Sequence, residues 1–363
     1  MSIVSKQGVG DYWSISEALA DADPNSRILI KPGAYQESLI LDKPVELLGE
    51  GPTEEIIIHG LEENCIQMET DHAVIRGMTL LLETAPEVER FALDIPQGEL
   101  VVEDCDITSN SLACVGIYGR ASNPVLRRCR VHHSRQDSGI LVYEGGGGTI
   151  EDCEIFENNL HGVEISEGST TIVQRCKIYS NGQSGIDGYD DGEGLVEDCD
   201  IYRNGYHGVS VNAGGNPVIR SCRFHDNRMN GFFSYEKGKG VVEICDILDN
   251  GYQGVEIREE GDPVIKHSRI RGSGQAGIHV WQGGKGTIEN CDILENGEYG
   301  VAIRHGGDPV VRKCRISRNG NVGVYVWDQG RGTVEECVLT DNTGGAWFLE
   351  PDCLLTRRQN TES

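Results

Sequence analysis

Residues 148–165 read GTIEDCEIFENNLHGVEI, and the same pattern returns as NPVIRSCRFHDNRMNGFF at 216–233, GVVEICDILDNGYQGVEI at 240–257 and GTIENCDILENGEYGVAI at 286–303. Each copy holds short apolar runs separated by turn residues. No run has the ten or more residues with helical spacing that a helical repeat needs. The pattern therefore predicts one unit of three short strands, repeated along the chain.

The cysteines set the length of this repeat. From the first to the seventh they lie 24, 24, 23, 23, 23 and 23 residues apart, Ser268 takes the next place, and the series then resumes. They are Cys105, Cys129, Cys153, Cys176, Cys199, Cys222 and Cys245, followed by Cys291, Cys314 and Cys337. A three-stranded coil of this length is typical of a right-handed parallel β-helix, whose coils stack about 4.8 Å apart. The ten cysteines and Ser268 mark eleven coils, and two earlier coils centre near Leu48 and Gly77. We therefore predict an all-β solenoid of about thirteen coils.

Two further columns support this register. The residue five positions after the cysteine is usually asparagine, and stacked amides can bond to one another and to turn backbone groups inside the coil. This column contains Asn110, Asn158, Asn181, Asn204, Asn227, Asn250, Asn296, Asn319 and Asn342, with Ser134 and Ser273 in the remaining places. A column of glycines, from Gly116 to Gly323 at intervals of 23 residues, predicts positive φ or a very close approach of the neighbouring chain.

Charges near the cysteine alternate in sign from coil to coil. Two residues before it, consecutive coils carry Glu103, Arg127 and Glu151. Neighbouring parallel strands place equivalent residues side by side, so the alternation pairs opposite charges, fixes the register and makes the full repeat a doublet of 46 residues. The cysteines themselves are interpreted as small apolar filler of a narrow core rather than a metal or redox array, because zinc needs four converging ligands.

The composition limits the classes of partner. The chain has 32 basic and 58 acidic residues and a net charge of −26, which argues against binding to a phosphate backbone. Its longest apolar stretches fall far below the roughly 20 residues of a membrane span, and MSIVSKQGVG lacks a basic-then-apolar export signal. We expect a cytoplasmic protein with reduced cysteines that binds neither nucleic acid nor membrane.

Three segments are expected. Residues 1–60 hold an N-terminal cap helix and the first coils, residues 61–342 form the β-helix, and residues 343–363 form a C-terminal cap with a frayed tail. In SISEALADADPNS, Ser14 and Glu17 have the spacing of a capping box. The C-terminal cap is thin and leaves strand edges exposed, so we expect a monomer or an end-to-end dimer.

An outward-facing column follows the glycines, because residues two and four positions after each glycine point outward in the next strand. The residue four positions on is aromatic in every second coil: Tyr143, Tyr189, Tyr235, Trp281 and Trp327, with Arg258 and Arg304 between the last three. Aromatic rings two coils apart, about 9.6 Å, match alternate sugars of an extended glycan and also suit a protein-binding surface. The alternative is that aromatic residues simply favour strands.

The residue two positions after the glycine is a carboxylate in two consecutive coils, Glu164 and Asp187. Carboxylates roughly 5 Å apart have the spacing of a retaining glycosidase pair, or could hold calcium through oxygen ligands. Asp190 and His207 are further catalytic candidates. The alternative is that these are solvated acids on a very acidic surface. No cofactor is expected and no metal ligands are assigned, with calcium as the one ion left open.

The coils between Asn123 and Asn342 resemble a known family. Through NPVLRRC, GGGTIEDCEIFENN, NPVIRSC and GKGVVEICDILDNG they are similar to the CASH-type β-helix (carbohydrate-binding and sugar-hydrolase) of the F-box-only protein eleven family and the Shc SH2-domain-binding protein. In those relatives the β-helix is mainly a platform for protein partners, which is what the resemblance implies here. No F-box-like segment is visible, so ubiquitin-ligase function is not implied.

The N-terminal stretch is similar to the opening of pectin methylesterases, with GDYWSISEAL, KPGAYQE and LLGEGPTEEIII in the family's order. The later catalytic motifs of that family are not found, so this resemblance implies a pectin-lyase-like fold and cap without the esterase. Asp190, Asp191 and the pair His207-Gly208 faintly echo polygalacturonases, whose NTD and RIK elements are missing.

We therefore predict a recognition scaffold that binds a protein or polysaccharide along its aromatic and acidic face. The alternative is a carbohydrate-active enzyme, a polysaccharide hydrolase, lyase or epimerase, that uses the paired carboxylates. A parallel β-helix fold can support either function.

Overall fold

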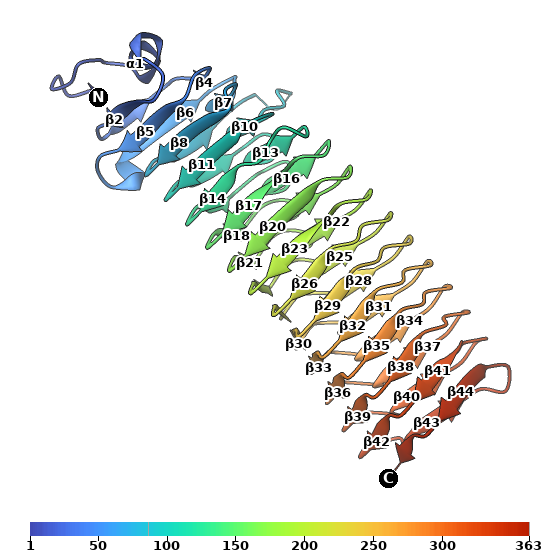
Figure 1. The fold of residues 1–363 in the computed structure, drawn as a ribbon. Coiled ribbons are helices and arrows are strands. Elements are labelled where there is room, and N and C mark those ends of the chain that lie inside the picture. Colours follow the sequence, from blue (N-terminus) through green and yellow to red (C-terminus); the bar gives the residue numbers. More distant parts are fainter. Residues whose placement is uncertain (86, 363) are drawn as a thin grey trace. The chain divides into compact units, whose positions relative to one another are not determined.

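The regular secondary structure of the chain consists almost entirely of short parallel strands (Figure 1). A computed structural model describes residues 1–85 and 87–362. It divides into an N-terminal unit, Met1–Gly182, and a C-terminal unit, Gln183–Ser363. Each unit contains three parallel sheets, called A, B and C here, to which the coils contribute strands in turn. The predicted all-β parallel solenoid is thus confirmed.

The strands of the N-terminal unit are given in the order in which they pair. Sheet A contains β1 (Ser2–Val4), β2 (Ser26–Ile30), β5 (Val45–Gly49), β8 (His72–Arg76), β11 (Glu99–Glu103), β14 (Val125–Arg127), β17 (Gly147–Glu151) and β20 (Thr170–Gln174). Sheet B contains β3 (Gly33–Tyr35), β6 (Ile56–Gly60), β9 (Thr79–Leu82), β12 (Asp106–Ser109), β15 (Arg130–His132), β18 (Glu154–Phe156) and β21 (Lys177–Tyr179). Sheet C contains β4 (Leu39–Leu41), β7 (Ile66–Met68), β10 (Leu93–Ile95), β13 (Val115–Tyr118), β16 (Ile140–Tyr143) and β19 (Val163–Ile165).

The C-terminal unit repeats this arrangement. Sheet A contains β23 (Glu193–Glu197), β26 (Val218–Arg220), β29 (Val241–Glu243), β32 (Val264–Lys266), β35 (Thr287–Glu289), β38 (Val310–Arg312), β41 (Arg331–Glu335) and β44 (Leu354–Arg358). Sheet B contains β24 (Asp200–Tyr202), β27 (Arg223–His225), β30 (Asp246–Leu248), β33 (Arg269–Arg271), β36 (Asp292–Leu294), β39 (Arg315–Ser317), β42 (Val338–Thr340) and β45 (Thr361–Glu362). Sheet C contains β22 (Ile186–Gly188), β25 (Val209–Val211), β28 (Phe232–Ser234), β31 (Val255–Ile257), β34 (Ile278–Val280), β37 (Val301–Ile303), β40 (Val324–Val326) and β43 (Trp347–Leu349).

The number of coils differs from the prediction. Sheet A has eight strands in each unit, which gives about sixteen coils instead of about thirteen. The additional coils lie at the two ends of the sequence, where the cysteine that marks the repeat is missing. At the start, β1 and β2 already pair in parallel. At the end, β44 pairs with β41 over residues 354–358, and its last two residues, Arg357 and Arg358, belong to the polar tail RRQNTES that we expect to fray.

The N-terminal cap helix, α1 (Ile15–Asp21), forms where the sequence predicts it and packs against β1, β2 and β4. Ser14 Oγ accepts a hydrogen bond from the backbone N–H of Glu17 at 3.1 Å, as its capping spacing suggests. At the other end of the helix, Lys43 Nζ donates to the carbonyl of Leu19 at 3.0 Å. A second short helix, η1 (Thr53–Glu55), is a single 3₁₀ turn.

The asparagine column forms a buried hydrogen-bonded ladder. Asn227 Nδ2 donates to Asn250 Oδ1 at 3.0 Å and to the carbonyl of Ile201 at 3.2 Å. Asn227 Oδ1 in turn accepts from the backbone N–H and from Nδ2 of Asn204, at 3.1 and 3.0 Å. Asn227 is 1% exposed, so these bonds satisfy backbone groups that water cannot reach. The ladder is therefore part of the core.

The charge alternation pairs side chains as predicted. In the N-terminal unit Arg127 bridges Glu103 at 3.0 Å and Glu151 at 2.5 Å. In the C-terminal unit Arg312 pairs with Glu289 at 2.8 Å. These pairs are partly exposed, so each adds little to stability, but together they favour the register that is observed.

The glycine column is explained by close approach rather than by positive φ. A Cβ on Gly231 would lie 2.3 Å from Cγ2 of Ile247 and 2.8 Å from the carbonyl oxygen of Gly254, and no positive φ occurs at this glycine. The same contacts recur at Gly254, whose Cβ would lie 2.4 Å from Cγ2 of Ile270. Glycine is needed here because each coil passes directly over the next.

Positive φ is instead found at the residue before the cysteine, which is usually not glycine. In the C-terminal unit this position holds Ile244, with φ of 56°, where another coil has Asn290, with φ of 51°. Isoleucine is unfavourable in this region because its branched Cβ crowds the backbone, whereas asparagine tolerates it. Ile244 is also 59% exposed, so its side chain contributes little to the core.

Replacing Ile244 by asparagine should therefore stabilise the protein. We expect the free energy of unfolding to rise by about 1 kcal/mol, which is the cost of a left-handed conformation that asparagine largely avoids. Urea denaturation followed by circular dichroism measures this change. The reciprocal variant, Asn290→Ile, should lose a similar amount, and a loss of stability in Ile244→Asn would contradict this explanation.

Candidate functional site

The outer face of sheet C in the C-terminal unit carries a continuous stack of rings and guanidinium groups. Arg258 Cζ lies 5.6 Å from the ring centroid of Tyr235 and 5.5 Å from that of Trp281. Arg304 Cζ lies 4.7 Å from Trp281 and 5.6 Å from Trp327. We call these five residues the arginine–aromatic ladder. All five belong to the column named from the sequence, and Arg258 and Arg304 stack between its last three rings.

The repeat explains why these side chains meet. Each member of the ladder follows a strand of sheet C, in the order β28, β31, β34, β37 and β40. Parallel pairing in register, such as that of β31 with β34 and of β34 with β37, places residues 23 positions apart side by side. Aromatic and guanidinium planes attract one another when they stack, so the alternation of the two types favours a rigid, ordered surface.

Three buried polar atoms on this face have no hydrogen-bond partner: Nε of Arg258, Nε of Arg304 and Nε2 of His279. Buried polar groups are normally paired in folded proteins, so these atoms are exceptions to the rule. Arg258 has a carboxylate nearby, Glu259 Oε1 at 3.4 Å from its Nε. Arg304 is therefore the arginine whose charge is most available to a ligand.

His279 and Glu256 lie beside the ladder and were not among the predicted site residues. The ring of His279 lies nearly parallel to those of Trp281 and Trp327, with centroids 5.8 and 6.2 Å away. Burial, and then the charge of Arg304, lowers the pKa of His279 to about 4, so the imidazole is neutral at neutral pH. Glu256 accepts a hydrogen bond from Trp281 Nε1 at 2.8 Å. Both residues stand two positions after a glycine, in the column of Glu164 and Asp187, and this register is the signal that could have identified them.

A small aromatic pocket adjoins the ladder near Trp327. It has a volume of about 220 Å³ and is lined by Tyr299, Asn321, Val322, Tyr325 and Phe348. The rings of Tyr325 and Trp327 stack 4.2 Å apart, which makes the pocket continuous with the ladder. An aromatic wall with one amide side chain is typical of sites that hold a sugar ring.

The two remaining aromatic residues of the predicted column lie elsewhere. Tyr143 ends β16 in the N-terminal unit, where its ring stacks on Tyr118 at 4.9 Å. Burial raises the pKa of Tyr143 and raises that of Tyr118 to about 12, so both phenols stay neutral. Tyr189 follows β22 in the C-terminal unit and is half-buried.

The predicted carboxylate pair is divided between the two units. Glu164, in β19 of the N-terminal unit, accepts a hydrogen bond from Ser138 Oγ at 2.7 Å. Asp187, in β22 of the C-terminal unit, is 8% exposed. Because the two residues lie in different units, their role as a catalytic pair stays a prediction.

Asp190 and His207 both belong to the C-terminal unit. Asp190 is exposed, in a turn with φ of 47°. His207 is 8% exposed, its Nδ1 accepts the backbone N–H of Asn230 at 3.4 Å, and its ring packs against Phe233 at 4.5 Å. These packing contacts give His207 a structural role in its coil, and catalytic roles for both residues stay predictions.

The N-terminal unit holds one buried acid that the sequence pattern did not reveal. Asp94 in β10 is 5% exposed, and its Oδ2 accepts a hydrogen bond from Asn64 at 2.9 Å while its Oδ1 has no partner. Burial raises the pKa of Asp94, against the opposing effect of the neighbouring Tyr118 and Asn64 side chains. Its strand precedes the first cysteine of the series, where the repeat has no landmark.

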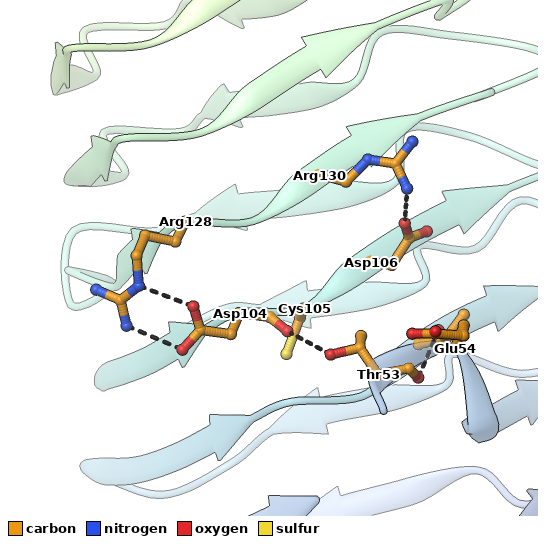
Figure 2. A pocket seen from close by; sticks show the side chains of 8 residues that line it. Thr53, Glu54, Asp104, Cys105, Asp106, Arg128 and Arg130 are labelled. Carbon is orange, nitrogen blue, oxygen red and sulfur yellow. Dashed lines mark hydrogen bonds and ion pairs between the residues drawn. The ribbon is translucent and has the colours of Figure 1, made fainter. Parts of the chain in front are cut away.

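A larger cavity in the N-terminal unit, about 560 Å³, is lined by charged residues that neutralise one another (Figure 2). Arg128 binds Asp104 through two hydrogen bonds of 2.7 and 2.9 Å, and Arg130 binds Asp106 at 2.5 Å. The hydrogen bond from Arg128 holds the pKa of Asp104 below its usual value. Because these charges are already paired, the charged side chains of the cavity are less available to a ligand than the guanidinium of Arg304 in the ladder.

The described residues contain neither a metal centre of three or more ligands nor a helix that spans a membrane. Within residues 1–85 and 87–362, no three His, Cys, Asp or Glu side chains gather as metal ligands. No helix in that part of the chain is long and apolar enough to cross a membrane. All thirteen cysteines are free thiols, and twelve of them are buried.

Comparison with known proteins identifies the fold family. The family described as the right handed beta helix region matches residues 92–217, 121–244 and 219–361. No curated protein matches the chain. Among solved structures, the A-modules of the Azotobacter vinelandii mannuronan C-5 epimerases AlgE6 and AlgE4 are similar, with TM-scores of 0.66 and 0.60 at 16% and 15% identity, over 96% of this chain and 93% of each module. The periplasmic alginate epimerase AlgG is similar with a TM-score of 0.50 at 11% identity, over 96% of this chain and 81% of AlgG. At such low identity these likenesses show the fold alone, and the matched residues show that the chain belongs to the right-handed β-helix family.

Proposed function

We propose that the chain is a carbohydrate-binding β-helix whose arginine–aromatic ladder holds an extended acidic polysaccharide. The observation that carries this proposal is the environment of Arg304, whose guanidinium is stacked between Trp281 and Trp327 while its Nε is buried and unpaired. A guanidinium held in place between two rings, on a side chain that is half-buried rather than covered, suits the carboxylate of a sugar acid.

The spacing of the ladder supports a polymer rather than a small anion. Arg258 and Arg304 lie two coils apart, about 9.6 Å, with an aromatic ring on either side of each. A strand of uronic acids would place alternate carboxylates near the two arginines and lay its sugar faces on the rings. On a chain with a net charge of −26, the two arginines also give an acidic ligand a specific place to bind.

Two likenesses agree with a carbohydrate ligand. The AlgE6 and AlgE4 modules are named as epimerases of mannuronan, which is a polymer of a uronic acid. The CASH-type resemblance of residues 123–342 points to the same ligand class through its name. A protein platform, as in the F-box-only protein eleven family, is the other outcome that the resemblance allows.

Binding measurements with matched sugars test this proposal. Isothermal titration should show that wild type binds mannuronan oligomers more tightly than neutral mannan oligomers of equal length. Arg304→Gln should weaken binding of the acidic oligomer by about tenfold, the loss expected for one charge-assisted contact, and leave the weak binding of the neutral oligomer unchanged.

Arg223→Gln is the matched control, because Arg223 lies on sheet B with its Nη1 3.8 Å from Asp200. This variant should bind like wild type. Equal affinity for the two oligomers, or no binding of either at millimolar concentration, would contradict the proposal, and the second result would favour a protein partner.

A further inference from the structure

The N-terminal unit brings two adjacent histidines together at the end of a strand. His132 is the last residue of β15, and His133 follows it with φ of 58°. In an extended strand successive side chains point to opposite faces, but the left-handed turn at His133 brings its ring back toward that of His132. The two ring centroids lie 4.8 Å apart with planes at 76°.

Carboxylates fix the outer nitrogen of each ring. His132 Nε2 lies 2.9 Å from Asp106 Oδ1, and His133 Nε2 lies 3.0 Å from Glu157 Oε2. A carboxylate only accepts hydrogen bonds, so each Nε2 carries the proton of its ring. In the neutral tautomer this leaves a lone pair, and no proton, on each Nδ1.

These two lone pairs face each other. The Nδ1 atoms of His132 and His133 are 2.6 Å apart. Two lone pairs at this distance repel each other unless a cation lies between them, so the site requires either a shared proton or a bound metal ion. A metal-binding histidine commonly donates its second nitrogen to a carboxylate, and here both histidines do so.

The distance between the nitrogens selects the kind of metal. Two nitrogens bound at about 2.0 Å lie about 2.8 Å apart at adjacent corners of a square-planar ion, and about 3.3 Å apart on a tetrahedral ion. The observed 2.6 Å is closer to the value for a right angle, which square-planar and octahedral ions share, than to the tetrahedral value. Among ions with such geometry, Cu²⁺ and Ni²⁺ suit imidazole nitrogens best. Water would complete the coordination, since no third protein ligand gathers here among the described residues.

The surroundings hold the rings in place. The ring of His132 stacks on Phe156 with centroids 4.7 Å apart and planes at 17°. Only 12% of the His132 side chain is exposed, compared with 56% for His133, so the pair is open to solvent on one side. Arg130 balances the charge of Asp106, which leaves Glu157 to attract a cation.

We propose that the facing Nδ1 atoms of His132 and His133 bind one Cu²⁺ or Ni²⁺ ion. The site does not depend on the ladder, which lies in the other unit. The C-terminal unit contains the same arrangement with one change. There His225 Nε2 contacts Asp200 at 3.0 Å, but its Nδ1 faces Asp226 Oδ2 at 2.9 Å, so a carboxylate stands where the second histidine would be.

Electron paramagnetic resonance of the full chain with one equivalent of Cu²⁺ tests this site. The measurement uses a Cys353→Ser background, because Cys353 is the one cysteine that is not buried and its thiol would reduce copper. We expect a square-planar signal with coupling to two nitrogens, and competition with glycine gives the affinity. His133→Asp, which copies the arrangement of His225, should weaken Cu²⁺ binding at least about a hundredfold and remove one nitrogen coupling.

Two controls make the result decisive. His225→Gln should leave the spectrum and affinity unchanged, and thermal melting of each variant shows whether it folds. Equal Cu²⁺ affinity in wild type and His133→Asp would overturn the proposal. So would a wild type that binds no Cu²⁺ at pH 7.5 and shows a strongly deshielded proton in its NMR spectrum, because the two nitrogens then share a proton only.

Discussion

Asn227→Ala is expected to lower the free energy of unfolding by about 3–5 kcal/mol. The side chain makes four buried hydrogen bonds, two to Asn204, one to Asn250 and one to the carbonyl of Ile201. Alanine removes these four bonds inside the coil, although Asn250 Oδ1 still accepts the backbone N–H of residue 227 at 3.1 Å. A buried polar group that loses its partner costs about 1–3 kcal/mol, partly offset by local relaxation. Urea denaturation followed by circular dichroism should show a lower midpoint at a similar slope.

Ser273→Ala is the matched control for this prediction. Ser273 occupies the same column and is 1% exposed, but its hydroxyl has no hydrogen-bond partner. Its removal should change stability by less than about 1 kcal/mol, since no bond is lost. A similar loss in the two variants would mean that the column acts through packing rather than through hydrogen bonds.

Trp281→Ala is expected to weaken binding of the acidic oligomer by about 30- to 100-fold, more than any other single change in the ladder. Both arginines stack on this ring, Arg258 at 5.5 Å and Arg304 at 4.7 Å, and its indole nitrogen donates to Glu256. Its loss frees both guanidinium groups and removes the sugar-stacking surface, which corresponds to a hot spot of about 2–3 kcal/mol. Isothermal titration measures the effect.

The control for this change is an exposed aromatic residue outside the ladder. Tyr252 is 45% exposed in the C-terminal unit, and Tyr252→Ala should bind the oligomer as wild type does. If the two variants lose affinity equally, the ligand contacts aromatic residues in general and the ladder is not its site. A Trp281→Ala variant with unchanged affinity would exclude the ladder directly.

The fold could be predicted because it repeats. The column that contains Asn227 and the column that contains Gly231 recur at one spacing, and parallel pairing in register converts that spacing into stacked coils. The first coils were missed because β1 and β2 carry no cysteine. The left-handed turns were missed as well, because residues such as Ile244 occupy them and no sequence rule places isoleucine there.

The candidate site was predicted only in part. The column from Tyr235 to Trp327 is visible in the sequence, but that Arg304 would stack against two rings depends on side-chain packing between coils. The neutral state of His279 likewise comes from burial, which the sequence does not display. The contacts of side chains on the outer face are therefore harder to predict from the sequence than the core positions, which recur in every coil.

Hydroxyl-radical footprinting with mass spectrometry shows whether the acidic polysaccharide lies on the ladder, because it locates the ligand on the folded protein. In the presence of a saturating mannuronan oligomer, we expect strong protection of Trp281 and Trp327 and no protection of the exposed Tyr206 and Tyr252. Neutral mannan at the same concentration should protect the ladder weakly. Binding of the acidic oligomer without protection of Trp281 and Trp327 would contradict the proposal that the ladder is its binding site.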